Sequence, residues 1–156
     1  DSLTQVHNRR SIQEIGHEFD AESKRYKIPY SIIMLDIDYF KDVNDRHGHH
    51  VGDKVLQEVA GLISEQMRET DHIGRWGGEE FVILSKLTNL EDSINYAQRL
   101  RKAVAEHEID PIGHITISLG VSAHRSDEKF EEAVRRADKA LYMAKDKGRN
   151  RVESLS

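Results

Sequence analysis

The chain has 156 residues, of which 37% are hydrophobic and 33% are charged, and its formal net charge is −5. This length suits one domain with a hydrophobic core and is short for two. The composition is typical of a soluble globular protein, and no apolar run is long enough to span a membrane. The negative charge argues against broad binding to nucleic acid, which requires a basic footprint.

Cysteine usage and the first residues bear on location. The chain has no cysteine, which excludes disulfides and thiolate metal sites and agrees with the cytoplasm. It starts at Asp1 and carries no signal peptide. We therefore expect a fragment of a longer protein, located in the cytoplasm or at the cytoplasmic face of a membrane.

The spacing of hydrophobic residues predicts the elements in chain order. It indicates a helix over residues 8–25, a buried strand over 31–35, a short helix over 40–46 that Gly48 breaks, and a helix from about 53 to 67. A strand over 72–76, a glycine turn and a strand over 81–84 then form a hairpin. A helix over 90–104, a strand over 114–122, a helix over 130–144 and an edge strand over 151–153 follow. Strands interleaved with helices predict an α+β or α/β layered sheet with helices on its faces.

Two carboxylates follow the buried strand, in Asp36-Ile37-Asp38. With the period of a strand, Asp36 and Asp38 project from one face and Ile37 from the other. Buried carboxylates without partners are unstable. Asp38 suits the N-cap of the next helix, whereas Asp36 has no such ordinary explanation.

The stretch Gly77-Gly78-Glu79-Glu80-Phe81 combines a turn with adjacent carboxylates. Two glycines between strands predict a two-residue hairpin turn with positive φ. Crowded carboxylates repel one another, and a cation relieves the repulsion. If the buried strand lies beside the hairpin, Asp36 and Glu79 meet and offer the oxygen ligands that Mg²⁺ prefers. Glu80 points to the opposite, solvated face in a regular strand and toward the site only if the turn bulges.

Residues that could bind an anion and a base follow Asp38. Tyr39, Phe40 and Lys41 open a helix, whose free N–H groups and lysine favour phosphate. Asn44, His49 and Asp53 lie downstream. A carboxylate can accept both donors of guanine's Watson–Crick edge, and an amide can serve the remaining groups. Alternatively, Asp53 caps a helix and Asn44 ends one.

Taken in order, these residues resemble the GGDEF domains, the diguanylate cyclases of bacterial signalling. The matching motifs are Asp1-Ser2-Leu3-Thr4, Asn8-Arg9-Arg10, Asp36-Ile37-Asp38-Tyr39-Phe40-Lys41, Asn44-Asp45, Gly48-His49, Gly52-Asp53, Gly77-Gly78-Glu79-Glu80-Phe81, Ala137-Asp138, Ala140-Leu141-Tyr142, Ala144-Lys145 and Gly148-Arg149-Asn150. The chain departs from the family at Gln5-Val6-His7, where a Gly-Leu pair is usual.

The resemblance implies an α+β fold: a central, mostly antiparallel sheet with helices on both faces, similar to the palm of nucleotidyl cyclases and some polymerases. It implies a single domain over residues 1–156, preceded in the longer protein by an input domain. Two GTP molecules, one on each protomer of an antiparallel homodimer, would condense to cyclic di-GMP and two pyrophosphates.

The resemblance also assigns roles to residues. Asp36, Glu79 and the carbonyl of Ile37 would hold Mg²⁺, or Mn²⁺ in its place, with two ions per GTP half-site. Glu80 would be a second metal ligand or the base acting on the 3′-hydroxyl. In a two-metal arrangement, one ion lowers the hydroxyl pKa and the other neutralises the triphosphate. Asn44 and Asp53 would read guanine with His49 nearby, and Asp53 would favour GTP over ATP. The phosphates would contact Lys41, Lys145, Arg149 and the N–H groups of Tyr39 and Phe40, with Gly77 and Gly78 leaving room for the nucleotide.

A second site is suggested by Arg68-Glu69-Thr70-Asp71. In the family, Arg-x-x-Asp ahead of the signature binds product and inhibits. Arg68 and Asp71 would form this site with Arg99. The plain alternative is an arginine that ends a helix and an aspartate in the next loop. Two other functions stay open: a catalytically silent receptor for cyclic di-GMP, and a palm-type polymerase or adenylyl cyclase. The intact signature opposes the receptor, the negative charge opposes the polymerase, and Asp53 opposes ATP.

Overall fold

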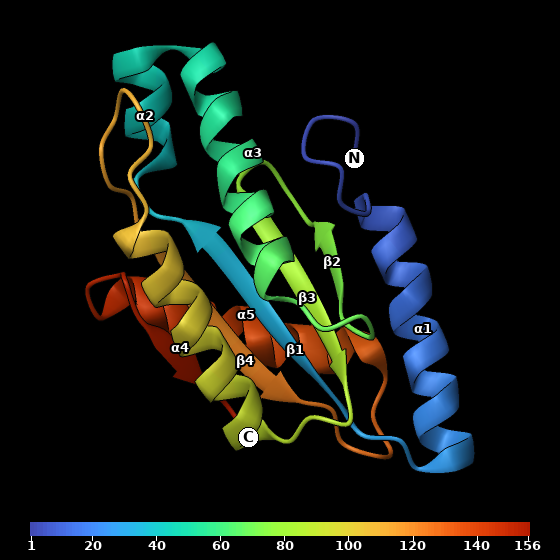
Figure 1. Cartoon of the computed structure of the whole chain (residues 1–156). Coiled ribbons are helices and arrows are strands. Elements are labelled where there is room, and N and C mark those ends of the chain that lie inside the picture. The colour runs from blue at the N-terminus through green and yellow to red at the C-terminus, as the bar shows by residue number, and fades with distance from the viewer.

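The computed structural model describes all residues from 1 to 156 as a five-stranded sheet with five helices (Figure 1). The helices are α1 (Arg9–Tyr26), α2 (Phe40–His47), α3 (His49–Gln66), α4 (Leu90–Glu106) and α5 (Phe130–Asp146). The strands are β1 (Tyr30–Ile37), β2 (His72–Arg75), β3 (Glu80–Lys86), β4 (Ile117–Ala123) and β5 (Val152–Ser154). The strand order is β2-β3-β1-β4-β5, and only the β4–β5 pair is parallel. The predicted α+β fold is confirmed.

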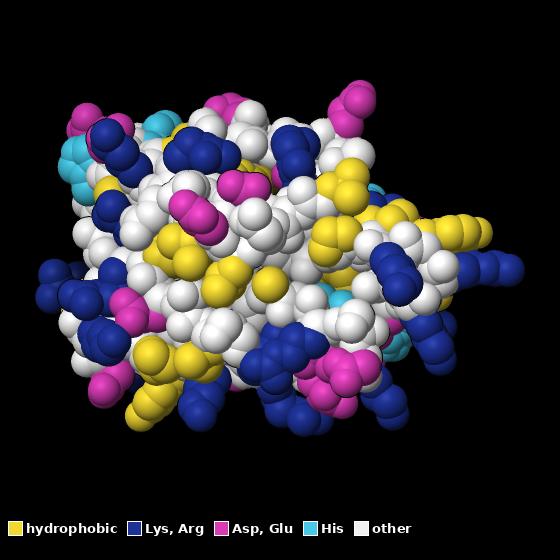
Figure 2. Space-filling view, turned by 90° about the horizontal axis from the view of Figure 1, so that it is seen from below, with side chains coloured by type: hydrophobic (Ala, Val, Ile, Leu, Met, Phe, Trp, Pro, Cys, Tyr) yellow, Lys and Arg dark blue, Asp and Glu magenta, His cyan; other side chains and the backbone are white.

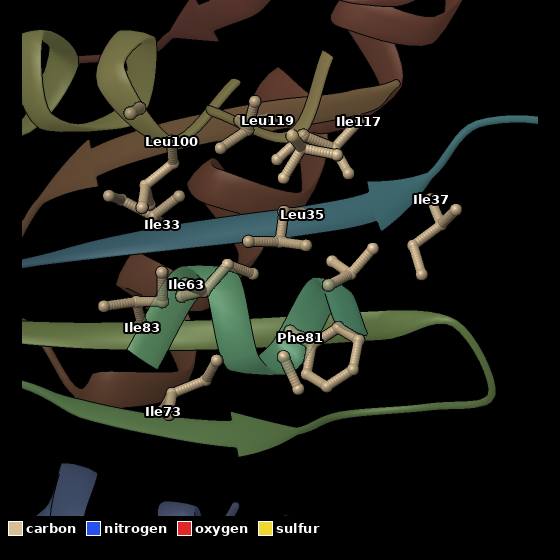
Figure 3. Close-up of a cluster of buried hydrophobic side chains, with 14 of the residues drawn as sticks. Ile33, Leu35, Ile37, Ile63, Ile73, Phe81, Ile83, Leu100, Ile117 and Leu119 are labelled. Atoms are coloured by element: carbon tan, nitrogen blue, oxygen red, sulfur yellow. The ribbon is translucent and has the colours of Figure 1, made fainter. Parts of the chain in front are cut away.

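The sheet separates two hydrophobic clusters. One contains Ile33 and Leu35 of β1 with side chains of α3 and α4, and part of it is drawn in Figure 3. The other contains Ile32 and Met34 with side chains of α1 and α5. Every residue of β1 is buried, as its nearly continuous apolar sequence predicts for a central strand. The carboxyl end of β1 is therefore held rigidly between two helix layers.

The residues just before α1 and α3 determine where these two helices begin. The side chain of Asn8 accepts a hydrogen bond from the Ser11 N–H at 2.8 Å and caps α1. Helix α3 begins at His49, directly after Gly48, which has φ +84°. The predicted start near residue 53 is wrong, because a glycine N-cap offers no capping side chain to recognise. Asp53 lies within α3 and is exposed, so the alternative that it caps this helix is also wrong.

The turn between β2 and β3 is longer than predicted. The strands end at Arg75 and restart at Glu80, and the N–H groups of Trp76 and Gly77 both donate to the Glu80 carbonyl. Neither Gly77 nor Gly78 has a positive φ, so the predicted two-residue turn is wrong. A Cβ on Gly78 would meet nothing within 4 Å, which leaves open space above the backbone.

The five helices include no segment with the length and hydropathy that a membrane span requires.

Candidate functional site

The acidic end of β1 lies against the start of β3. Asp36 pairs in register with Glu80, so their side chains share one face of the sheet. Glu79 precedes the strand, and its carbonyl accepts a hydrogen bond from the Ile37 N–H at 3.3 Å. Since Glu79 lies in the turn, it does not follow strand alternation, and it lines the same cavity as Asp36. Three carboxylates therefore converge where the upper ends of β1 and β3 meet in Figure 1.

These carboxylates perturb one another. Burial raises the pKa of Asp36 to about 6, with Glu79 and Glu80 adding to the rise and Lys145 opposing it. Burial also raises the pKa of Glu80, and Asp138 and Glu79 add to it, against Lys145 and Arg9. A raised carboxyl pKa marks a place where negative charge is poorly compensated. The site therefore favours a cation.

One cation is supplied by the protein itself. Lys145 of α5 donates a hydrogen bond to Asp36 Oδ2 and forms an ion pair with it. In this arrangement no three His, Asp or Glu side chains are grouped as a ready metal site. The donor set nevertheless fits Mg²⁺ chemically, because Asp36, Glu79 and Glu80 supply hard oxygens in the number that this ion needs from a protein. A metal ion at Asp36 would displace the ammonium of Lys145.

Asp38 is not the predicted N-cap. The N-cap of α2 is Tyr39, with φ 57°, and it makes no side-chain capping bond. The buried carboxylate of Asp38 instead accepts hydrogen bonds from the hydroxyls of Thr116 and Ser118, each at 2.7 Å, and from the Asn150 N–H at 3.0 Å. Asp38 thereby ties the end of β1 to β4 and to the loop after α5. The sequence pattern missed this role because its partners are about a hundred residues away.

A cavity of about 240 Å³ lies beside the carboxylates. Its lining joins Asp36 and Glu79 to the start of α2 and to Lys145 and Arg149. The guanidinium of Arg149 lies 4.9 Å from the ring centroid of the exposed Tyr39. Anionic and cationic groups thus face one space, as binding of a metal-bound polyphosphate requires. The sequence indicated the backbone of Tyr39 for this site but not its ring.

The residues predicted to read a base lie where α2 packs on α3. The Oδ1 atom of Asn44 is buried without a hydrogen-bond partner. A Cβ on Gly52 would come within 1.9 Å of that oxygen, so the glycine makes the room that Asn44 occupies. His49 and Asp53 are exposed on α3. An unpaired amide oxygen beside an exposed carboxylate suits a planar ligand with several donors.

The residues of the predicted second site surround another cavity, of about 290 Å³. Arg68, Asp71 and Arg99 all line it. The Asp71 side chain is only 1% exposed and pairs with Arg68. The predicted contact of Asp71 with guanine donors stays a prediction, and the contact that the structure records is with Arg68. Arg68 lies just beyond the end of α3 and Asp71 lies in the loop before β2, as the plain alternative also predicts.

Another side chain near the glycine turn escaped the sequence analysis. The Arg9 guanidinium lies 4.2 Å from the ring centroid of Trp76 and donates to the Trp76 carbonyl at 3.3 Å. The only sequence signal is the motif Asn8-Arg9-Arg10, which does not tell which arginine turns inward. Arg10 instead pairs with Glu14 on the surface of α1.

An acidic strand end opposite a glycine turn, on a palm-like antiparallel sheet, defines the class of GGDEF domains. The sequence matches the family described as "Diguanylate cyclase, GGDEF domain" over residues 1–151. The chain therefore belongs to this family.

Named relatives and solved structures agree with this assignment. Diguanylate cyclase DgcM of Escherichia coli strain K12 is 38% identical over 152 residues, which cover 97% of this chain and 37% of DgcM. The GGDEF domain of DgcB from Caulobacter crescentus, solved in complex with c-di-GMP, superposes with a TM-score of 0.95 at 31% identity, covering 99% of this chain and 94% of that one. The active GGEEF domain of a diguanylate cyclase from Vibrio cholerae gives a TM-score of 0.92 at 38% identity, covering 97% and 99%. The chain thus spans a little over a third of DgcM and nearly all of the solved domains.

Proposed function

We propose that this domain is a diguanylate cyclase, which condenses two GTP molecules into cyclic di-GMP and two pyrophosphates. The observation that carries the proposal is the convergence of Asp36, Glu79 and Glu80 beside a cavity that Lys145 and Arg149 also line. Kinship with proteins named diguanylate cyclases supports the same reaction.

Different residues of the site bind the phosphates and the base of GTP. The N–H groups at the start of α2, with Lys41, Lys145 and Arg149, bind the phosphates through charge-assisted hydrogen bonds. Asp53 accepts hydrogen bonds from the two donors of the guanine edge, Asn44 serves the remaining groups, and His49 lies at the rim of that site. Adenine lacks the donor pair that a carboxylate accepts, so it would leave Asp53 without a partner.

The reaction joins the nucleotides through their 3′-oxygens. Each 3′-oxygen attacks the α-phosphorus of the other GTP, a phosphodiester bond forms, and the bond to the β-phosphate oxygen breaks to release pyrophosphate. Glu80, with its raised pKa, accepts the hydroxyl proton. Asp36, Glu79 and the Ile37 carbonyl would hold Mg²⁺, which when bound would neutralise phosphate charge and acidify the hydroxyl.

One protomer holds one GTP, so the proposal requires a homodimer. The direct test incubates the domain with GTP and Mg²⁺ and measures cyclic di-GMP at increasing protein concentrations. We expect product, with a rate that rises more steeply than linearly with protein. A strictly linear rate down to nanomolar protein would contradict the half-site mechanism. Absence of product from a forced dimer that still binds cyclic di-GMP would favour the silent receptor.

The cavity around Arg68, Asp71 and Arg99 supports a second part of the proposal, inhibition by the product. Two guanidinium groups beside one cavity suit the phosphates and guanine edges of cyclic di-GMP. Figure 2 shows the end of the molecule opposite the glycine turn, where Lys and Arg side chains lie among Asp and Glu side chains.

Product inhibition gives the first prediction. In Arg68→Ala, the initial rate at low product should match that of the parent, because Arg68 contacts Lys86, at the opposite end of β3 from Glu80. The inhibition of that rate by added cyclic di-GMP should disappear. If the variant stays as inhibited as the parent, the assignment of this site is wrong.

A further inference from the structure

Arg68 and Arg99, which line the proposed product cavity, contact neighbouring side chains to which the proposed function gives no role. The Nη2 atom of Arg68 donates to Asp71 Oδ1 at 3.0 Å, to the Lys86 carbonyl at 3.0 Å and to the Thr88 hydroxyl at 2.8 Å. Its Nε donates to Asp71 Oδ1 at 3.3 Å. All these bonds use one edge of the guanidinium, which leaves Nη1 free for a ligand.

Thr88 is the part of this support that lies outside the Arg-x-x-Asp motif. Its side chain is buried, and its hydroxyl donates to the Lys86 carbonyl at 2.9 Å while it accepts from Arg68. The hydroxyl therefore has both hydrogen-bonding roles fixed. It holds Arg68 against the carboxyl end of β3 in a defined orientation.

Arg99 is supported by an aromatic ring. Its guanidinium lies 5.5 Å from the ring centroid of Tyr96, one helical turn earlier in α4. Tyr96 is itself buried in the wall of the same cavity. A buried ring cannot move with the arginine, so it restricts where the guanidinium can lie.

We propose that Thr88 and Tyr96 are positioning residues of the product site, which hold Arg68 and Arg99 facing the cavity before cyclic di-GMP arrives. A flexible arginine loses conformational entropy when it binds, and prior ordering removes that loss. This inference rests on the proposed product inhibition. It adds that the strength of inhibition depends on Thr88 and Tyr96 through the orientation that they give to Arg68 and Arg99.

The experiment uses Thr88→Val, which keeps the shape of the side chain and removes the hydroxyl. Loss of a hydrogen bond to a charged group should weaken cyclic di-GMP binding by about tenfold. Titration calorimetry measures that binding in the absence of GTP, and inhibition assays measure the corresponding rise in inhibitory concentration. The kcat without product should match the parent. Thr88→Ser, which restores the hydroxyl, should recover most of the affinity.

Matched variants separate the possible outcomes. Thr70→Val makes the same change at an exposed residue of the loop between α3 and β2, which carries Arg68 and Asp71. It should leave affinity unchanged, while melting curves check that every variant folds. If Arg68→Ala abolishes inhibition but Thr88→Val binds as tightly as the parent, the positioning role is refuted and the product site stands. If Arg68→Ala leaves inhibition intact, the product site and this inference both fail. Equal weakening in Thr88→Val and Thr88→Ser would also overturn the role of the hydroxyl.

Discussion

At the scale of single residues, Gly52 is the position where adding one carbon atom should most directly affect substrate binding. It is buried where α3 passes α2, and a Cβ there would lie 1.9 Å from Asn44 Oδ1. Since a contact below 3 Å cannot persist, Asn44 would have to turn away. In the proposed function, the glycine is therefore a condition for the amide of Asn44 to reach guanine.

Gly52→Ala is predicted to raise the KM for GTP by about tenfold, the cost of about one hydrogen bond, with a smaller effect on kcat. Steady-state kinetics in a forced dimer would measure both. Gly61→Ala on the same helix is the matched control, because nothing lies within 4 Å of a Cβ there. The control should keep the parent KM and gain about 0.5–1 kcal/mol of stability from reduced unfolded-state entropy. An unchanged KM in Gly52→Ala would contradict the role of Asn44.

The sequence predicts that Asp36 and Glu79 meet, because each stands next to an apolar strand or a glycine turn, where a carboxylate needs an explanation. The structure brings them together with Glu80, and their role in binding a metal stays a prediction. The role of Asp38 was missed, since its hydroxyl partners lie in β4 and just before that strand, and its N–H partner follows α5. A local capping rule cannot anticipate partners that tertiary packing brings together.

At the scale of elements, β4 and α5 cross so closely that a strand glycine lies against the helix backbone. A Cβ on Gly120 would lie 2.1 Å from the Ala137 carbonyl oxygen and 2.2 Å from the Leu141 nitrogen. Both atoms belong to the backbone of α5 and cannot move without the helix. This crossing fixes the helix that carries Lys145 against the strand next to β1.

Gly120→Ala should therefore destabilise the domain by about 3 kcal/mol, because overpacking would force α5 away from the sheet. Urea unfolding followed by circular dichroism measures the change. Gly78→Ala is the opposite case, since its Cβ would meet no protein atom within 4 Å. It should unfold like the parent yet lose activity if a nucleotide lies over the turn. Parent-like stability in Gly120→Ala would show that the helix can shift freely.

The sequence predicts the ranges of elements whose hydrophobic residues recur at regular spacing. It does not predict boundaries that depend on glycine. Helices α1, α4 and α5 and strand β1 carry long periodic or continuous apolar patterns, and their predicted ranges agree with the structure within a few residues. The start of α3 and the length of the β2–β3 turn depend on glycine backbone conformations. A glycine pair permits many turns, so the two-residue turn was only one of them.

At the scale of the whole molecule, stability should depend on pH through a buried ion pair at the end opposite the carboxylate site. Burial alone would raise the pKa of Glu128, but hydrogen bonds from the Arg136 side chain and the Arg125 backbone hold it below its ordinary value. A carboxyl with a depressed pKa in the folded state stabilises the fold while it is ionised. That contribution is present above the ordinary pKa and is lost as pH falls through the folded one.

Glu128→Gln should accordingly be less stable than the parent at neutral pH, because it leaves the half-buried Arg136 without its ionised partner. The difference in free energy of unfolding should shrink as the pH falls below 4.5, the ordinary carboxyl pKa. Denaturant titrations of the parent and the variant at the same series of pH values give this difference. The contributions of the other titrating groups are common to both proteins and cancel. A difference that stays constant down to pH 3 would contradict the depressed pKa.

The outer edges of the sheet have a consequence for how copies of the domain can meet. One edge, β2, is partly covered, because the His7 N–H donates to the Ile73 carbonyl at 3.1 Å and the Arg75 N–H donates to the His7 carbonyl at 2.8 Å. The other edge, β5, runs only from Val152 to Ser154. Short or covered edges discourage strand-to-strand polymerisation. In the proposed homodimer, the two copies would therefore meet through side chains and not by strand pairing, and such contacts can open again to release the product.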